Sequence, residues 1–202
     1  MFSLLEPSHQ TVNELIARQQ DCSFTYDEVG ATNTTPPQNF TLDHNRIEIG
    51  RGEQAFQAAI EAIRNWKQFD LGWVSIVPAG VKLEVGAIVA VKARALGTWS
   101  LSAARVIYLI DEPRKFGFAY GTLPDHVASG EERFMVEWLA DDSVWYDILA
   151  FSRPRHPLVK INVPLARMLQ KRFARDSKRR MLEEVQKYNP GPFQDSISKR
   201  ST

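Results

Sequence analysis

Residues Phe116 to Pro154 read FGFAYGTLPDHVASGEERFMVEWLADDSVWYDILAFSRP, a run of strand-like segments separated by polar loops. The first segment alternates strictly between large and small side chains. Because successive side chains of a strand point to opposite faces, Phe116, Phe118 and Tyr120 share one face. The other face carries only glycine and alanine, so we expect another part of the chain to pack closely against it.

Similar short segments precede and follow this strand, and turn signals rich in glycine, proline and aspartate separate them. Because so many consecutive strands have short connections, they predict an antiparallel meander. The predicted strands are Arg46–Gly50, Trp73–Val77, Ile88–Leu96, Thr98–Ile110, Phe116–Tyr120, Glu132–Trp138 and Val144–Phe151.

Apolar residues at helical spacing predict two longer helices, over residues 53–67 and 164–187. The order is then strand, helix, antiparallel strands and a long C-terminal helix. This order is typical of helix-grip domains, similar to START and pollen-allergen proteins, in which a curved sheet wraps the last helix and encloses an apolar cavity. The predicted fold class is therefore α+β helix-grip, with a cystatin-like or ferredoxin-like α+β sheet as the alternative.

Three segments carry a resemblance to a known family. They read GFAYGTLP over residues 117–124, SGEERF over 129–134 and FSRP over 151–154. Together with RIEIGRG at 46–52 and LQKRF at 169–173, they make the chain similar to the DUF1990 family, also called UPF0548, over roughly residues 24 to 185. One departure is visible: the family leads us to expect Gly-His-Pro where this chain has Asp125-His126-Val127. The family occurs in bacteria and plants and its function is unknown, so the resemblance implies no mechanism.

The 202 residues, 44% of them hydrophobic, are enough for one domain with a substantial core. We expect an N-terminal extension over residues 1–40 with a short helix and a proline-rich loop, a single domain over 41–188 and a flexible tail over 189–202. The formal charge of +1 gives no overall attraction to nucleic acid. A single cysteine, Cys22, is typical of a reducing compartment, and we predict a cytoplasmic protein.

The best candidates for chemistry lie in and after the polar loop. Glu131 and Glu132 are adjacent, so on a strand they point to opposite faces and cannot act as a pair. One of them can face inward, where apolar surroundings would raise its pKa and make it a proton acceptor. The interpretation that we favour is a salt bridge from that glutamate to Arg105, Arg133 or Arg153. We therefore name Glu132 and, in the loop, His126 as weak catalytic candidates.

The candidate ligand contacts come from the Phe116–Tyr120 strand, the strands after it and the C-terminal helix, with Arg153 or Glu132 as the polar anchor. They are Tyr120, Glu132, Arg133, Trp145, Arg153 and Phe173. We predict no metal site, because no histidines have metal-ligand spacing, and no cofactor.

The C-terminal helix is rich in basic residues, including Arg172, Arg175 and Arg179. A solvated helix face explains this pattern, and an anionic membrane surface is the other interpretation. We expect no nucleic-acid partner, because no stacking platform or RNA-binding motif accompanies the basic residues.

Three functional hypotheses remain open. The first is a non-enzymatic domain that binds an apolar or amphipathic small molecule in the sheet–helix cavity. The second is an enzyme of the cyclase, hydrolase or isomerase type that uses Glu132 or His126 in the same cavity. The third is a protein- or membrane-interaction domain that docks through the basic helix.

Overall fold

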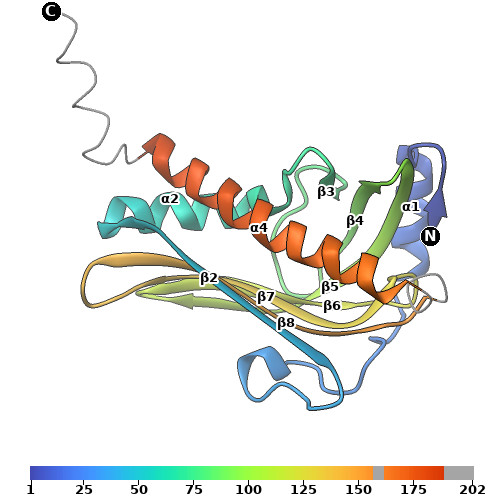
Figure 1. Ribbon diagram of the computed structural model, residues 1–202, viewed down its shortest axis with the longest axis horizontal. Coiled ribbons are helices and arrows are strands. Elements are labelled where there is room, and N and C mark those ends of the chain that lie inside the picture. Colours follow the sequence, from blue (N-terminus) through green and yellow to red (C-terminus); the bar gives the residue numbers. More distant parts are fainter. Residues whose placement is uncertain (157–161, 189–202) are drawn as a thin grey trace, which may run out of the picture.

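A computed structural model describes residues 1–156 and 162–188 (Figure 1). The predicted tail at 189–202 lies outside the described residues. The elements in chain order are β1 (Phe2–Ser3), α1 (His9–Arg18), η1 (Ala31–Asn33), β2 (Thr41–Arg51), α2 (Gly52–Arg64), η2 (Lys67–Phe69), β3 (Val74–Val77), β4 (Ile88–Ala95), β5 (Thr98–Glu112), β6 (Lys115–Thr122), β7 (Ala128–Trp138), β8 (Ser143–Pro154) and α4 (Val163–Tyr188).

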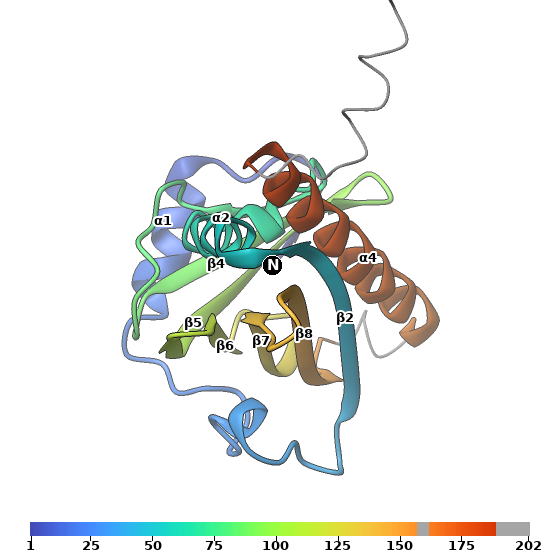
Figure 2. The same cartoon turned by 90° about the vertical axis from the view of Figure 1, so that its left-hand side faces the viewer.

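The strands form one antiparallel sheet in the order β2-β8-β7-β6-β5-β4-β3, with β1 paired to β5. Helices α2 and α4 lie on its concave face, and the sheet curves around them (Figure 2). The predicted helix-grip α+β architecture is therefore confirmed, with the meander and the long C-terminal helix in the expected places. No helix in the described ranges combines the length and the apolar character that crossing a bilayer requires.

Several element boundaries differ from the sequence prediction, and β7, for example, begins at Ala128 and not at Glu132. The strand predicted over Arg46–Gly50 is longer, because β2 pairs with β8 from Thr41 opposite Ser152 to Arg51 opposite Ser143. The added residues are mostly exposed, so they gave no apolar signal. Helix α2 ends at Arg64, before the predicted residue 67, because Trp66 adopts a left-handed backbone with φ of 56° and η2 follows.

The main core lies between the concave face and the two helices. The aromatic side chains of β6 and β7 fill it together with η2, because their alternate residues all point to this side. Phe118, Phe134 and Phe69 are almost completely buried, and the rings of Phe69 and Phe134 lie 5.1 Å apart at 65°. These edge-to-face contacts fill the centre of the domain with closely packed aromatic rings.

The bare face of β6 is covered as the sequence predicted, and the covering element is the N-terminal segment. Phe24 and Tyr26 lie directly over Gly121, where an added Cβ would stand 2.8 Å from the Phe24 ring and would also collide with the Tyr26 hydroxyl. Only a residue without a side chain allows this approach. The N-terminal residues therefore form a layer on the convex face of the sheet.

Candidate functional site

A cavity of about 510 Å³ lies between the sheet and the N-terminal half of α4. Its walls come from β2, from β4 to β8 and from α4. Phe69, Tyr120 and Phe173 stand at its inner end, where the cavity meets the aromatic core. Small side chains such as Ala93 and Ala150 line the sheet side of the cavity. They do not reach across to α4, so space remains between the sheet and the helix. Its volume is within the range of small-ligand sites.

Glu132 is the acidic side chain at the inner end of this cavity. It points to the concave face from β7, opposite Ala150 of β8 and Tyr120 of β6. The Tyr120 hydroxyl donates a hydrogen bond of 2.8 Å to Glu132 Oε2. The side chain is half-buried and lines the cavity, so its accessible surface faces the cavity space.

Burial raises the pKa of Glu132 to about 7. The main cause is the loss of hydration around the carboxylate, because the charged form is poorly solvated among apolar walls. The hydrogen bond from Tyr120 opposes the effect, and the negative charge of Asp43 adds to it. Near neutral pH this carboxyl group can therefore both accept and release a proton.

His126 also lines the cavity, at the end formed by the loop between β6 and β7. Its Nδ1 lies 3.1 Å from both the backbone nitrogen and the backbone oxygen of Ala128. Burial lowers the pKa of His126 to about 4. The ring is therefore neutral at pH 7 and a weak proton acceptor, which makes Glu132 the stronger candidate for acid–base chemistry.

Of the six predicted ligand contacts, the structure brings together Tyr120, Glu132 and Phe173 in the cavity wall. The other three do not reach it. Arg133, Trp145 and Arg153 lie on the convex face. Arg133 follows Glu132 directly in β7, so it points to the opposite side, and Trp145 and Arg153 alternate in the same way with Ala150 of β8. The prediction that all three residues contact a ligand in the cavity therefore placed them on the wrong face. For Arg133 the alternation with Glu132 already argued against it, whereas for Trp145 and Arg153 the β7–β8 register was needed.

Each of these three side chains has a partner on the convex face. Arg133 donates to Asp147 Oδ1 at 3.0 Å and to the Thr32 carbonyl at 2.9 Å. The indole N–H of Trp145 donates to the hydroxyl of Ser143, and Arg153 lies 4.5 Å above the ring of Phe40. Arg133 and Arg153 therefore contact the N-terminal segment, whereas Trp145 contacts Ser143 of its own strand.

Glu131 carries out a structural task that the sequence did not reveal. It is 2% exposed on the convex face. Its Oε2 accepts hydrogen bonds from the Tyr26 hydroxyl at 2.9 Å and the Gly30 N–H at 2.7 Å, and its Oε1 accepts from the N–H and the hydroxyl of Thr32. The expected salt bridge to an arginine is therefore wrong for both glutamates, since Glu132 pairs with Tyr120 and Glu131 with the N-terminal segment.

Polar residues at the α4 side of the cavity were missed by sequence reasoning. Arg167 makes a bidentate ion pair with Asp43. The distance from Arg167 Nη2 to Asp43 Oδ1 is 2.6 Å, and Nη1 bonds Oδ2. Gln170 donates to the Ser152 hydroxyl at 3.1 Å and accepts from Arg167. Asp43 lies in the part of β2 that was not predicted as strand, so its approach to α4 had no local signal.

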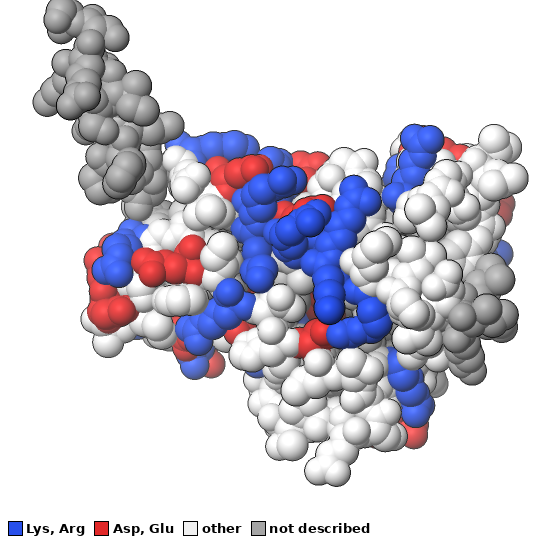
Figure 3. Space-filling model, in the orientation of Figure 1, with Lys and Arg blue, Asp and Glu red and all other residues white. Residues whose placement is uncertain are grey.

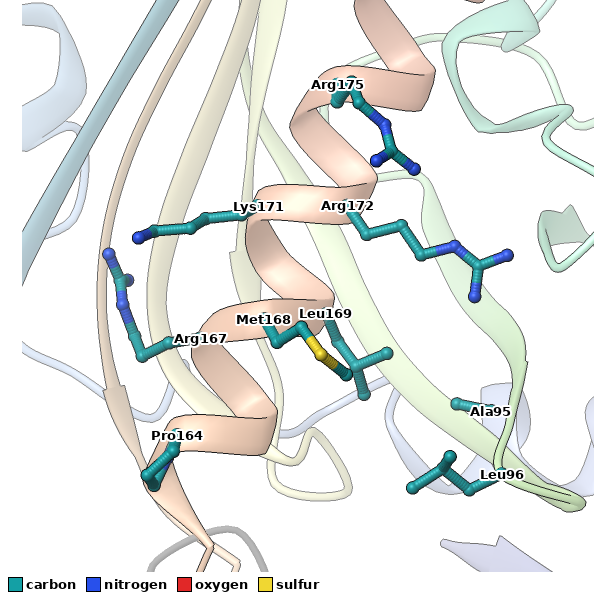
Figure 4. A pocket seen from close by; sticks show the side chains of 9 residues that line it. All are labelled: Ala95, Leu96, Pro164, Arg167, Met168, Leu169, Lys171, Arg172 and Arg175. Carbon is teal, nitrogen blue, oxygen red and sulfur yellow. The ribbon is translucent and has the colours of Figure 1, made fainter.

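An open groove runs along the outside of α4 beside the tip of the β4–β5 hairpin. It shares four lining residues with the cavity, Ala95, Leu96, Leu169 and Lys171, so the two spaces are adjacent. In Figure 4, Leu169 points toward Leu96, and Arg167 and Lys171 point to the other side of the helix. Figure 3 shows that basic side chains gather over α4.

The exposed surface of this groove mixes apolar and basic groups. Leu96 is 76% exposed and Met168 is 54% exposed. Arg172 and Arg175 lie in the groove and share the buried Asp176, with contacts of 3.5 and 3.0 Å. Arg179 is farther along the helix, where it contacts Glu183. In the described part of the chain, no three His, Cys, Asp or Glu side chains are grouped to hold a metal ion.

Comparison with known proteins agrees with this architecture. A UPF0548 protein of Dictyostelium discoideum is 34% identical over 92% of this chain and 96% of its own length. A UPF0548 protein of Deinococcus radiodurans is 35% identical over 87% of this chain and 94% of its own length. Among solved structures, the Zhui aromatase/cyclase from Streptomyces sp. R1128 shares the fold, with a TM-score of 0.52 and 10% identity over 73% of this chain and 94% of its own.

The sequence profile of the domain of unknown function DUF1990 matches residues 25–180. The matched range includes strands β2 to β8, α2, most of α4 and, from residue 25 onward, the segment that covers the convex face. The chain therefore belongs to the DUF1990 family, whose relatives are named UPF0548 proteins.

Proposed function

We propose that this protein binds an apolar or amphipathic small molecule in the cavity between the sheet and α4. The observation that carries the proposal is a cavity of about 510 Å³ with largely apolar walls and a carboxyl group, Glu132, at its inner end. Burying apolar ligand surface there would supply roughly 25 cal/mol per Å², and a few polar groups would fix the ligand's orientation.

The first experiment is native mass spectrometry of the full chain purified from its own host, followed by organic extraction and identification of any bound molecule. A stoichiometric apolar molecule is the expected result. A second experiment uses a neutral fluorescent dye, Nile red, whose emission reports an apolar environment, with protein from which bound lipid has been removed.

The dye experiment has a matched pair of variants on neighbouring residues of β8. Ala150→Trp fills the cavity beside Glu132, whereas Leu149→Trp adds the same group on the opposite face. We expect Ala150→Trp to abolish dye binding and Leu149→Trp to retain it, with circular dichroism showing that both fold. Equal binding by the two variants would overturn the proposal.

A second candidate function is catalysis in the same cavity, and the state of Glu132 favours it. A carboxyl group with a pKa near 7 beside a tyrosine hydroxyl is suited to proton transfer, as a cyclase, hydrolase or isomerase would require. The extracted molecule should then be converted on incubation. Under this hypothesis Glu132→Gln retains binding but loses turnover, whereas an unconverted molecule assigns the cavity to binding alone.

We also propose that α4 contacts an anionic membrane surface through Arg172, Arg175 and Arg179. The exposed Leu96 and Met168 beside the basic groove support this, because apolar and basic groups together suit a headgroup region. Flotation with phosphatidylcholine vesicles, with and without phosphatidylserine, tests it.

The variants for the flotation experiment are matched in charge. Reversing the three α4 arginines to glutamate should abolish binding to phosphatidylserine vesicles. The control reverses three exposed basic residues outside α4, namely Arg18, Lys82 and Lys115, and should retain it. If both triple variants lose binding equally, net charge and not the α4 surface explains the attraction.

A further inference from the structure

The polar side chains around the cavity differ in whether they are already occupied. Asp43 is held by Arg167, and Gln170 by Ser152 and Arg167. Lys171 is exposed and lines both the cavity and the outer groove, which places it at the rim. Glu132 is therefore the acidic group that remains available to a bound molecule at the inner end.

Only one oxygen of Glu132 is occupied by the protein. Tyr120 donates to Oε2, and no donor among the described residues reaches Oε1. Ala150, opposite Glu132 on β8, is too small to cover this oxygen. Oε1 is thus left facing an apolar space. A polar oxygen there lowers the stability of the folded protein unless a water molecule or a ligand donates a hydrogen bond to it.

The charges around Glu132 restrict what that ligand group can be. A carboxylate or phosphate would meet Glu132, whose charged form is already disfavoured, while Arg167 is already paired with Asp43 and is not free to attract an anion. An ammonium group would need the ionised carboxylate, which the apolar walls disfavour. A hydroxyl group can donate to the carboxylate and accept from the protonated acid, so it satisfies Oε1 in both states.

We propose that the cavity selects an apolar alcohol, whose hydroxyl group binds Oε1 of Glu132 while its hydrocarbon part lies against Phe69, Ile148 and Phe173. The inference rests on the proposed binding function and names the chemical class of its ligand. The hydroxyl lies at the inner end, and the hydrocarbon runs from these three side chains past Leu169 of α4 toward the hairpin tip at Leu96.

Four compounds with the same chain test the inference: decanol, decanoic acid, decylamine and decane. Each is titrated against Nile red bound to the full, lipid-free chain at pH 7. We expect decanol to displace the dye at the lowest concentration, about tenfold below decane, as one hydrogen bond to a buried carboxyl group implies. A tighter displacement by the acid or the amine would overturn the inference.

Variants show whether Glu132 causes the preference. The double variant Glu132→Leu, Tyr120→Phe removes the carboxyl group together with the hydroxyl that it would leave unpaired, and should remove the tenfold preference for decanol over decane. Glu132→Gln should keep part of it, because the amide still hydrogen-bonds. An unchanged ratio in the double variant refutes the inference.

The outcome also separates this inference from the broader proposal. If all four compounds displace the dye equally and Ala150→Trp still blocks it, the cavity binds apolar molecules and only the alcohol preference is wrong. If no compound displaces the dye and Ala150→Trp binds it as well as the unmodified protein, the cavity itself is not a binding site and the proposed function fails.

Discussion

Replacing Glu132 with glutamine should change how the stability of this protein depends on pH. The pKa of Glu132 is about 7 in the folded protein, against an ordinary value of 4.5. The folded protein therefore still holds this proton at pH values where the unfolded chain has released it. The contribution of this bound proton to the stability of the folded protein is complete below about pH 4.5 and is lost as the pH rises through 7.

The size of the effect follows from the difference between the two pKa values. A difference of about 2.5, at about 1.4 kcal/mol per unit, gives about 3 kcal/mol. Glutamine has nearly the same shape and no titrating proton, so the variant lacks this term. The unfolding free energy of the unmodified protein should therefore fall by about 3 kcal/mol more than that of Glu132→Gln when the pH is raised from 4 to 8.

Urea unfolding followed by tryptophan fluorescence, at a series of pH values from 4 to 8, measures this difference. Tyr120→Phe is the companion variant. It removes the hydrogen bond that favours the charged carboxylate, so the pKa of Glu132 should rise further and the loss of stability at pH 8 should increase. Parallel stability curves for Glu132→Gln and the unmodified protein would show that Glu132 is not shielded from water, and would refute the reasoning.

The other predictions concern the convex face. Glu131→Ala leaves the Tyr26 hydroxyl and two backbone N–H groups unpaired, so it should lower the unfolding free energy measured in urea by about 3 kcal/mol or more. It should also expose residues 24–33 to limited proteolysis, and an unchanged protease pattern would contradict the anchoring role. Gly121→Ala should lower the unfolding free energy by about 1–3 kcal/mol, because the new methyl group collides with the N-terminal layer. An unfolding free energy equal to that of the unmodified protein would mean that this layer is loosely held. Arg153→Ala should leave the affinity for Nile red unchanged, since its guanidinium lies over Phe40 on the far face, and a reduced affinity would place it back in the site.

The sequence by itself determined the class and order of the elements. Period-two alternation at Phe116, Phe118 and Tyr120 identified a strand with one bulky face, and the structure buries all three beside η2 and α4. The helical spacing of apolar residues, with Pro164 near the start, located α4 to within a residue or two. These signals are local, because they depend only on the backbone geometry of each element.

The sequence also separated the two adjacent glutamates onto opposite faces, since neighbouring residues of a strand alternate. It could not say which glutamate faces which side, or what each one contacts. Tyr26, Gly30 and Thr32 reach Glu131 across about a hundred residues of chain, and no local pattern encodes such a contact.

The tertiary structure alone decided which side chains line the cavity. Trp145 and Arg153 were assigned to it from residue type, but the pairing of β7 with β8 fixes their direction, and a change of one residue in register moves a side chain to the other face. Alternation with Glu132 was enough to turn Arg133 away from the cavity. In the same way, Asp43 meets Arg167 only because β2 continues along β8 beneath α4. The cavity is a property of the space that sheet and helix leave between them, so only the folded structure decided that Glu132, and not Arg153, faces it.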